Sequence, residues 1–140
     1  ERLKRHVAPR PVTLAGKRIL VVEDEPSLRD LLADAFTKAC AQVETAADGI
    51  QGWTLWSAGR YDLVVSDQRM PGCTGLELLA RIRATGSLVP MILASGYGLE
   101  GLEADLDRDP RLRLLPKPFT LRALFELVAS LLEVPGQAQA

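Results

Sequence analysis

Cysteine and histidine are scarce in this chain, and their scarcity excludes several kinds of functional site. The sequence holds two cysteines, Cys40 and Cys73, with no C-x-x-C pair, and one histidine, His6. Two cysteines are too few for a disulfide scaffold, and reduced thiols in a cytoplasmic protein explain them. Because His6 lies in a polar, proline-flanked segment, a Ser-His-Asp or Cys-His site in the folded body is all but excluded, as is a metal site of several imidazoles. The chemistry must come from carboxylates, hydroxyls and lysines.

Long apolar runs and a net charge of one sign are also lacking. No apolar run exceeds about five residues, against roughly 20 for a membrane-spanning helix, and no segment reads as a signal peptide. Lysine and arginine number 17 against 18 aspartates and glutamates, so the formal net charge is −1. This balance gives no electrostatic reason to bind nucleic acid or an anionic membrane, and we expect neither as a partner.

Length and composition indicate one folded domain between two polar ends. The 140 residues are 47% hydrophobic and 25% charged, which is ordinary for a single globular domain. The first 20 residues carry six basic residues and one acidic residue, with Pro9 and Pro11 among them. We therefore divide the chain into a basic leader or linker (residues 1–16), a folded body (17–133) and a polar tail (134–140).

Two patterns of apolar residues alternate along the folded body, one typical of buried strands and one typical of helices. Short apolar runs such as Ile19 to Val22 are typical of strands buried on both faces, and apolar residues at helical spacing follow them. We predict strands at residues 19–22, 42–45, 61–66, 91–94 and 111–115, and helices at 26–39, 49–59, 76–86, 98–107 and 121–132. Right-handed crossovers then give an α/β fold with a single five-stranded parallel sheet and helices on both faces.

Side chains suited to chemistry follow four of the predicted strands. Glu23 and Asp24 come directly after the first strand, and Asp67 comes after the third. Ser95 follows the fourth strand and Lys117 the fifth. Because the carboxyl ends of parallel strands share one edge, where such folds bind ligands, we expect these side chains to meet. Crowded carboxylates repel one another, and a hard cation with oxygen ligands, Mg²⁺, is the usual remedy.

In this order the motifs resemble the receiver domain of bacterial two-component response regulators, over roughly residues 17–133. The resemblance is carried by Val22-Glu23-Asp24-Glu25-Pro26, by Asp67 with Met70-Pro71-Gly72 and Gly75, by Ser95 five residues after Pro90, and by Lys117-Pro118-Phe119. It implies a flavodoxin-like (βα)5 fold with strand order 2-1-3-4-5. It also implies a phosphoacceptor of a phosphorelay, which is phosphorylated and switches conformation instead of turning over as an enzyme.

The resemblance implies a metal site and a donor. Asp67 would take a phosphoryl group from a phosphohistidine on a sensor histidine kinase or a phosphotransfer domain. Asp24 and Asp67 would ligate Mg²⁺ directly, together with the backbone carbonyl of Arg69. Glu23 would act mainly through a bound water.

Two further residues would act on the phosphoryl group itself. Lys117 would pair with one of its oxygens, and Ser95 would donate a hydrogen bond to it. Pro118 would follow a cis peptide bond that aims Lys117 at the site. Catalysis would then be positioning plus electrostatics, as phosphoryl transfer generally requires.

Two positions depart from the family pattern. Leu114 stands where the family often has Tyr or Phe three residues before the lysine, and Tyr97 is the aromatic residue nearest to Ser95. Glu23 replaces a more usual Asp. We expect the domain still to be phosphorylated. The way in which phosphorylation is transmitted to partner proteins should differ, and the longer Glu23 side chain should shift the metal geometry.

Rival interpretations fit the residues less well. A degenerate receiver that acts only through protein contact would lack the Asp or the Lys. An aspartyl phosphatase of the haloacid dehalogenase type would need an acid two residues after Asp24, where Pro26 stands. A flavodoxin-like cofactor binder is disfavoured by the acidic loop, and no P-loop motif is present. The domain is either free-standing or joined behind another domain, as in a hybrid sensor kinase, and a homodimer is open in both cases.

The remaining conspicuous residues receive simple structural interpretations. Phe36, Trp53 and Trp56 are assigned to packing, because no basic groove accompanies them. Thr74 caps a helix, and Glu25 is an exposed residue in the first turn of a helix. Cys73 is assigned no role.

Overall fold

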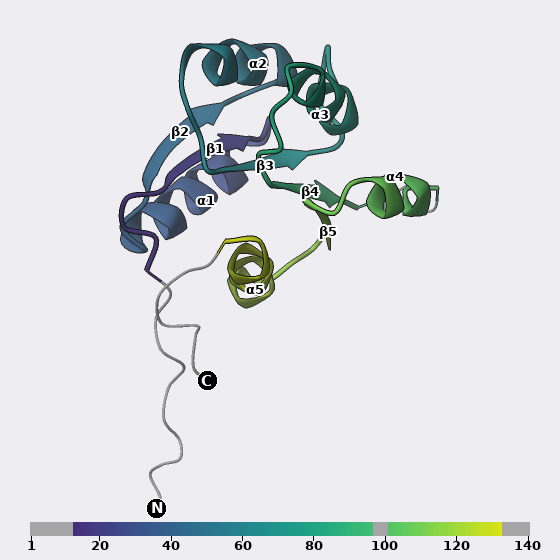
Figure 1. Ribbon diagram of the computed structural model, residues 1–140. Coiled ribbons are helices and arrows are strands. Elements are labelled where there is room, and N and C mark those ends of the chain that lie inside the picture. Colours follow the sequence, from purple (N-terminus) through teal and green to yellow (C-terminus); the bar gives the residue numbers. More distant parts are fainter. Residues whose placement is uncertain (1–12, 97–100, 133–140) are drawn as a thin grey trace, which may run out of the picture.

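The computed structural model describes residues 13–96 and 101–132, in which five strands alternate with five helices (Figure 1). In chain order the elements are β1 (Arg18–Val22), α1 (Pro26–Lys38), β2 (Gln42–Ala46), α2 (Gly49–Ala58), β3 (Leu63–Asp67), α3 (Gly75–Ala84), β4 (Met91–Ser95), α4 (Glu103–Arg108), β5 (Leu112–Pro116) and α5 (Leu121–Leu131). The strands are parallel, in the order β2-β1-β3-β4-β5. The predicted α/β fold with its flavodoxin-like strand order is therefore confirmed.

The register of the sheet aligns the carboxyl ends of its strands. Val22, the last residue of β1, lies opposite Ser66 of β3, and Ser95, the last residue of β4, lies opposite Pro116 of β5. The residue after β1 and the last residue of β3 therefore stand side by side at one edge. The residue after β5 lies at the same edge, which is where the predicted site residues fall.

Two hydrophobic cores hold helices on opposite faces of the sheet (Figure 1). Helices α1 and α5 cover one face, where Phe36 and Leu124 are fully buried. Helices α2, α3 and α4 cover the other face, where Leu78 and Ile82 are fully buried. Each such side chain contributes about 1.5–3 kcal/mol of burial free energy. The cores thus fix the strands, and with them the side chains at the strand ends.

Polar side chains begin four of the described helices. Asp48, Thr74 and Thr120 accept a hydrogen bond from a backbone N–H in the first turn of α2, α3 and α5, and the cap predicted at Thr74 is confirmed. Thr74 and Glu77 form a reciprocal capping box. Glu25 differs from the prediction, because it precedes α1 and caps it by accepting from the N–H of Leu28 (2.7 Å).

The largest difference from the predicted elements is in α4. It begins at Glu103 instead of residue 98, has no side-chain cap, and buries none of its own residues. Its short length follows from this weak anchoring. No other bound differs from its prediction by more than two residues, and β5 includes Pro116 instead of ending before it.

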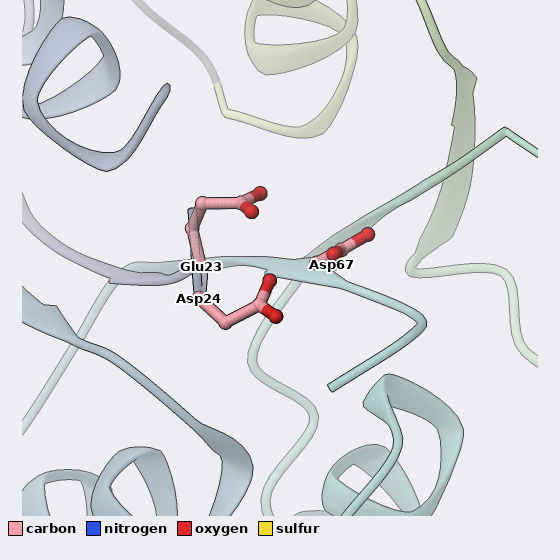
Figure 2. A group of neighbouring side chains, drawn as sticks. All are labelled: Glu23, Asp24 and Asp67. Atoms are coloured by element: carbon pink, nitrogen blue, oxygen red, sulfur yellow. The ribbon is translucent and has the colours of Figure 1, made fainter. Parts of the chain in front are cut away.

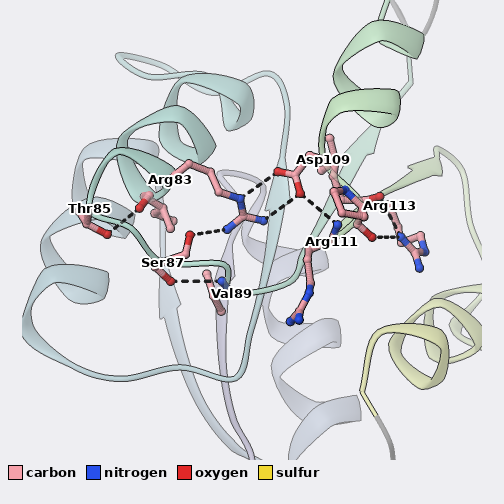
Figure 3. A network of polar contacts seen from close by, with 10 residues as sticks. Arg83, Thr85, Ser87, Val89, Asp109, Arg111 and Arg113 are labelled. Atoms are coloured by element: carbon pink, nitrogen blue, oxygen red, sulfur yellow. Dashed lines mark hydrogen bonds and ion pairs between the residues drawn. The ribbon is translucent and has the colours of Figure 1, made fainter.

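An ion pair ties α3 to the segment between α4 and β5, at the amino end of the sheet (Figure 3). Arg83 Nε lies 2.9 Å from Asp109 Oδ2, and both side chains are less than one-fifth exposed. The same guanidinium donates to the carbonyl of Ser87 (3.2 Å), and Asp109 also accepts from the N–H of Arg111 (3.0 Å). This network fixes the far end of α4, where its own packing is weak.

The aromatic residues pack as predicted. The rings of Trp53 and Trp56 stack with centroids 5.8 Å apart, and the guanidinium of Arg81 lies over Trp53. Cys73, assigned no role from sequence, is 6% exposed and packs directly on α2. A Cβ added at Gly49 would lie 2.6 Å from Cys73 Cβ. Cys73 therefore packs so closely on α2 that only glycine fits at position 49.

Several predictions lie outside the described residues. They concern most of the basic leader including His6, the polar tail, Tyr97, and residues 98–100 of the predicted fourth helix. None of the helices in the described ranges has the length and apolar character that a membrane span requires.

Candidate functional site

Three carboxylates meet where β1 and β3 end. Figure 2 shows Glu23 and Asp24 beside Asp67, and one carboxylate oxygen from each lies within 4.8 Å of the others. Glu23 and Asp67 are 2% and 7% exposed, whereas Asp24 is exposed. The expected convergence of these three acids is thus present, with two acids buried and one facing solvent.

Backbone and side-chain contacts hold the acidic turn after β1. The N–H of Glu23 donates to the carbonyl of Ala46 at the end of β2 (3.0 Å), which continues the sheet by one residue. Its carboxylate turns back and accepts from the N–H of Glu25 (3.1 Å). Arg29 of α1 donates to the carbonyl of Glu23 (3.0 Å) and clamps the turn from the helix side.

Lys117 reaches the acids from the end of β5. Its Nζ lies 3.2 Å from Asp67 Oδ1 and 3.5 Å from Glu23 Oε1. Its backbone N–H donates to the carbonyl of Ser95 (2.9 Å), so Ser95 and Lys117 stand next to each other at the sheet edge. The Lys117–Pro118 peptide bond is cis, as the resemblance implied.

Burial and charge act against each other at this site. Burial raises the pKa of Glu23, and the neighbouring charge of Asp67 raises it further, against the lowering effects of the Glu25 N–H and of Lys117. Burial alone would lower the pKa of Lys117, but its hydrogen bond to Asp67 and the charges of Glu23 and Asp67 raise it above its ordinary value. Lys117 therefore stays an ammonium ion. The excess negative charge on the three carboxylates favours the binding of a second cation.

The donor set fits Mg²⁺. Three carboxylates are hard oxygen ligands, and the exposed side of Asp24 leaves room for the waters that Mg²⁺ retains. One ammonium against three carboxylates leaves a net negative site, which a divalent ion neutralises. Ser95 is 2% exposed at the same edge, and the backbone of Arg69 follows two residues after Asp67.

The loop after Asp67 packs tightly on the site. A Cβ added at Gly75, the first residue of α3, would lie 2.6 Å from the carbonyl oxygen of Asp67 and 2.3 Å from Leu93 Cδ1. Gly72 within the loop has a φ of 81°, which glycine adopts without strain. The glycines of the motif are therefore required by close approach and by backbone conformation.

Two residues of the site carry no sequence signal. Arg29, which donates to the carbonyl of Glu23, has the sequence pattern of any charged residue on an amphipathic helix. Gln68 follows Asp67 and accepts a hydrogen bond from the N–H of Leu76 through its side chain (2.9 Å). Neither contact could be inferred from spacing, because both depend on the path of a loop.

Fold and site together define a class: a doubly wound parallel α/β domain with an acidic, lysine-flanked site at the carboxyl edge of its sheet. The family model described as the response regulator receiver domain matches residues 19–129. The chain belongs to this family, whose members are phosphoacceptor modules of two-component signalling.

Individual relatives agree with this assignment. The transcriptional regulatory protein TcrA of Mycobacterium tuberculosis is 37% identical over 123 residues, which cover 84% of this chain and 47% of TcrA. The sensor kinase CckA of Brucella abortus is 34% identical over 117 residues, 82% of this chain and 12% of CckA. The solved structure of the response regulator TrrA from Thermotoga maritima, in complex with Mg²⁺-BeF, has a TM-score of 0.72 at 35% identity and covers 83% of this chain and 99% of that one. This chain spans less than half the length of both curated relatives.

Proposed function

We propose that Asp67 is the phosphoacceptor of this domain and that the acids around it hold Mg²⁺. The single observation that carries the proposal is the contact of Lys117 with Asp67, at 3.2 Å, inside a cluster of three carboxylates. The comparison with TrrA, whose structure holds Mg²⁺-BeF, supports it.

The metal ligands in this proposal are Asp24, Asp67 and the backbone carbonyl of Arg69, with Glu23 acting through water. Bound Mg²⁺ would supply positive charge for the oxygens of the transferring phosphoryl group. Glu23 also receives the N–H of Glu25 and the ammonium of Lys117, so it orients the ligand turn from behind. The extra methylene of Glu23 is accommodated by this inward position.

In the transfer, an Asp67 carboxylate oxygen attacks phosphorus and forms a new O–P bond. The N–P bond of the donor phosphohistidine breaks, its electron pair returns to the imidazole, and that nitrogen takes a proton from solvent. Lys117 moves its hydrogen bond from the Asp67 carboxylate to a phosphoryl oxygen. Ser95 donates to another oxygen of the product, an aspartyl phosphate. The domain is a stoichiometric acceptor that ends in a changed state, and not a turnover enzyme.

An apolar hollow beside Lys117 supports a protein as the donor. The hollow, of about 470 Å³, is lined mainly by Leu28, Leu31, Phe119 and Leu121. Leu31 is 48% exposed, and Leu121 is 37% exposed. A helix that carries a phosphohistidine, on a sensor histidine kinase or phosphotransfer domain, would cover these side chains while it presents phosphorus to Asp67.

Three wider features of the proposal extend beyond the site. The receiver occupies residues 17–133, between the leader (1–16) and the tail (134–140). Two free cysteines, Cys40 and Cys73, agree with a reducing compartment, which we take to be the cytoplasm. Two further statements stay predictions: that the domain is either free-standing or the receiver of a hybrid kinase, and that it can form a homodimer.

The alternative of a degenerate receiver is disfavoured by one observation. A module used only for protein contact has no need of a lysine held against a buried aspartate, and Lys117 and Asp67 make that contact. The haloacid dehalogenase alternative would make Asp24 the nucleophile, but Asp24 is the exposed member of the cluster and has no second acid two residues further on.

Incubation of the chain with acetyl phosphate and Mg²⁺, followed by intact mass measurement, tests the proposal. We expect one added phosphoryl group, its loss in Asp67→Asn, and its retention in Asp30→Asn, a matched change at an exposed aspartate of α1. Label that persists in Asp67→Asn, or a wild-type chain that takes no label, would overturn the assignment.

A further inference from the structure

One side chain closes the loop that follows Asp67. The backbone N–H of Gln68 donates to the carbonyl of Ala94 (2.9 Å), and its own carbonyl accepts from the N–H of Gly75 (3.0 Å). Its side-chain Oε1 accepts from the N–H of Leu76 (2.9 Å). Both oxygens of a single residue thus hold the first two N–H groups of α3, groups that a helix leaves without a partner of its own.

These bonds join the two ends of the loop at one point. Gly75 already lies against the carbonyl of Asp67, where a Cβ would come within 2.6 Å of that oxygen. Residues 69–74 therefore leave the sheet edge and return to it beside the proposed phosphoacceptor. Arg69 is the first residue of this segment, so the direction of its backbone carbonyl depends on how Gln68 is held.

We propose that Gln68 is a positioning residue for the Mg²⁺ site, because its side-chain amide fixes the loop from which the Arg69 carbonyl reaches the metal. This inference rests on the proposed function, in which that carbonyl is a ligand. Gln68 itself touches neither the metal nor the phosphoryl group.

The chemistry of Mg²⁺ makes such positioning matter. The ion demands near-ideal octahedral geometry, and a backbone carbonyl cannot turn toward it without a change in the dihedral angles of its neighbours. The neighbouring cap works differently. The bonds between Thr74 and Glu77 lie within the start of α3 and do not reach across the loop to β3. The Gln68 side chain, by contrast, adds to the Gln68 carbonyl a second bond between the first turn of the helix and the end of β3.

Paired variants of the full chain test the proposal. Gln68→Met keeps the side-chain length and removes the acceptor of the Leu76 N–H, whereas Thr74→Val removes the acceptor of the Glu77 N–H in the same helical turn. NMR titration with MgCl₂ measures the dissociation constant without any phosphodonor. We expect Gln68→Met to raise that constant about tenfold, as loss of a residue that orients metal ligands commonly does, and Thr74→Val to change it less than about twofold.

Phosphorylation by acetyl phosphate provides the second measurement. The Mg²⁺ concentration for half-maximal rate should rise with the dissociation constant in Gln68→Met, while the rate at saturating Mg²⁺ stays within about twofold of the wild type. Gln68→Glu, which retains an acceptor oxygen at the same reach, should bind Mg²⁺ at least as tightly as the wild type. Gln68→Leu, which also lacks the acceptor, replaces Gln68→Met if that variant does not fold.

The outcomes separate this inference from the function beneath it. Unchanged Mg²⁺ affinity in Gln68→Met, an equal loss in Thr74→Val, or weakened binding in Gln68→Glu would overturn the positioning role while the wild-type chain still binds Mg²⁺ and takes a phosphoryl group. A wild-type chain that does neither would overturn the proposed function, and the positioning role with it.

Discussion

The ammonium of Lys117 lies 3.2 Å from a carboxylate oxygen of Asp67, although the two residues are 50 positions apart in the chain. They end up in contact because β3 ends at Asp67 and β5 ends one residue before Lys117 at the same edge of the sheet, with β4 between them. The contact places the Lys117 ammonium where it would meet the oxygens of a phosphoryl group that arrives at Asp67.

Lys117→Met should therefore slow phosphorylation by acetyl phosphate about 100-fold, the usual effect of removing one donor to developing negative charge. Mg²⁺ binding should be retained or tightened, because the three carboxylates lose a competing cation. Intact mass measured over time follows the rate, and NMR titration follows the metal. Lys38→Met, at an exposed pair on α1, is the matched control and should behave as the wild type. A normal rate in Lys117→Met would contradict the assigned role.

Gly75→Ala should destabilise the domain by about 2–3 kcal/mol, since the new methyl group overlaps the backbone of Asp67 as well as Leu93. Urea denaturation followed by circular dichroism measures the loss. Gly59→Ala is a suitable control, because its Cβ would meet only ordinary contacts at 3.4 Å or more. Equal midpoints for the two variants would show that the start of α3 can move away from β3.

Arg83→Met should cost about 2 kcal/mol at neutral pH, because it leaves the partly buried carboxylate of Asp109 without its main partner. Arg108→Met, which removes a largely exposed pair with Asp105, should cost less than about 0.5 kcal/mol. A similar cost for the two variants would mean that burial adds nothing to the Arg83 pair.

The cost of Arg83→Met should also depend on pH. Burial alone would raise the pKa of Asp109, but the hydrogen bonds from Arg83 and from the Arg111 N–H outweigh it, so the pKa lies below its ordinary value of 3.8. A carboxyl with a lowered pKa stabilises the fold above its unfolded-state pKa, and this contribution is lost as the pH falls through the folded-state value. The difference in unfolding free energy between wild type and variant should therefore shrink below pH 3.8. A difference that is constant down to acid pH would contradict an ionic origin.

The two thiols should react at very different rates. Cys40 is exposed, whereas Cys73 is buried and burial raises the pKa of its thiol, which leaves little thiolate. A thiol reagent such as Ellman's should label one cysteine per native chain quickly and the second only on unfolding. Cys40→Ser should remove the fast phase. Rapid labelling of two thiols in the native chain would contradict the packing of Cys73 on α2.

The architecture and the convergence at the sheet edge could both be predicted, for a physical reason. A parallel α/β sheet places the ends of its strands together, so Glu23, Asp67 and Lys117 could be assigned to one place from strand positions alone. Their contacts follow that rule. The chemical roles of these residues, and of Ser95 and the Arg69 carbonyl, stay predictions that the labelling and metal experiments test.

The structural features that could not be predicted from the sequence depend on loop paths and on weak local signals. The hydrogen bond from Leu76 to Gln68 exists only because residues 69–74 return to the sheet edge, and no spacing rule predicts that return. The late start of α4 agrees with the lack of a side-chain cap and of buried residues in this helix, and with the glycine, Gly101, that precedes it. Cys73 shows the same limit, since its burial depends on a glycine in another helix.

The shared ammonium has a consequence for the resting protein. Because Lys117 is already divided between Glu23 and Asp67, the unphosphorylated domain carries its own counterion, and an arriving phosphoryl group exchanges one anionic partner for another instead of recruiting a spare charge. A free inorganic anion would therefore have to compete with Glu23 and Asp67 for the Lys117 ammonium. In the proposed function, discrimination would come from covalent attachment of the phosphoryl group to Asp67, which places new negative charge beside the Lys117 ammonium.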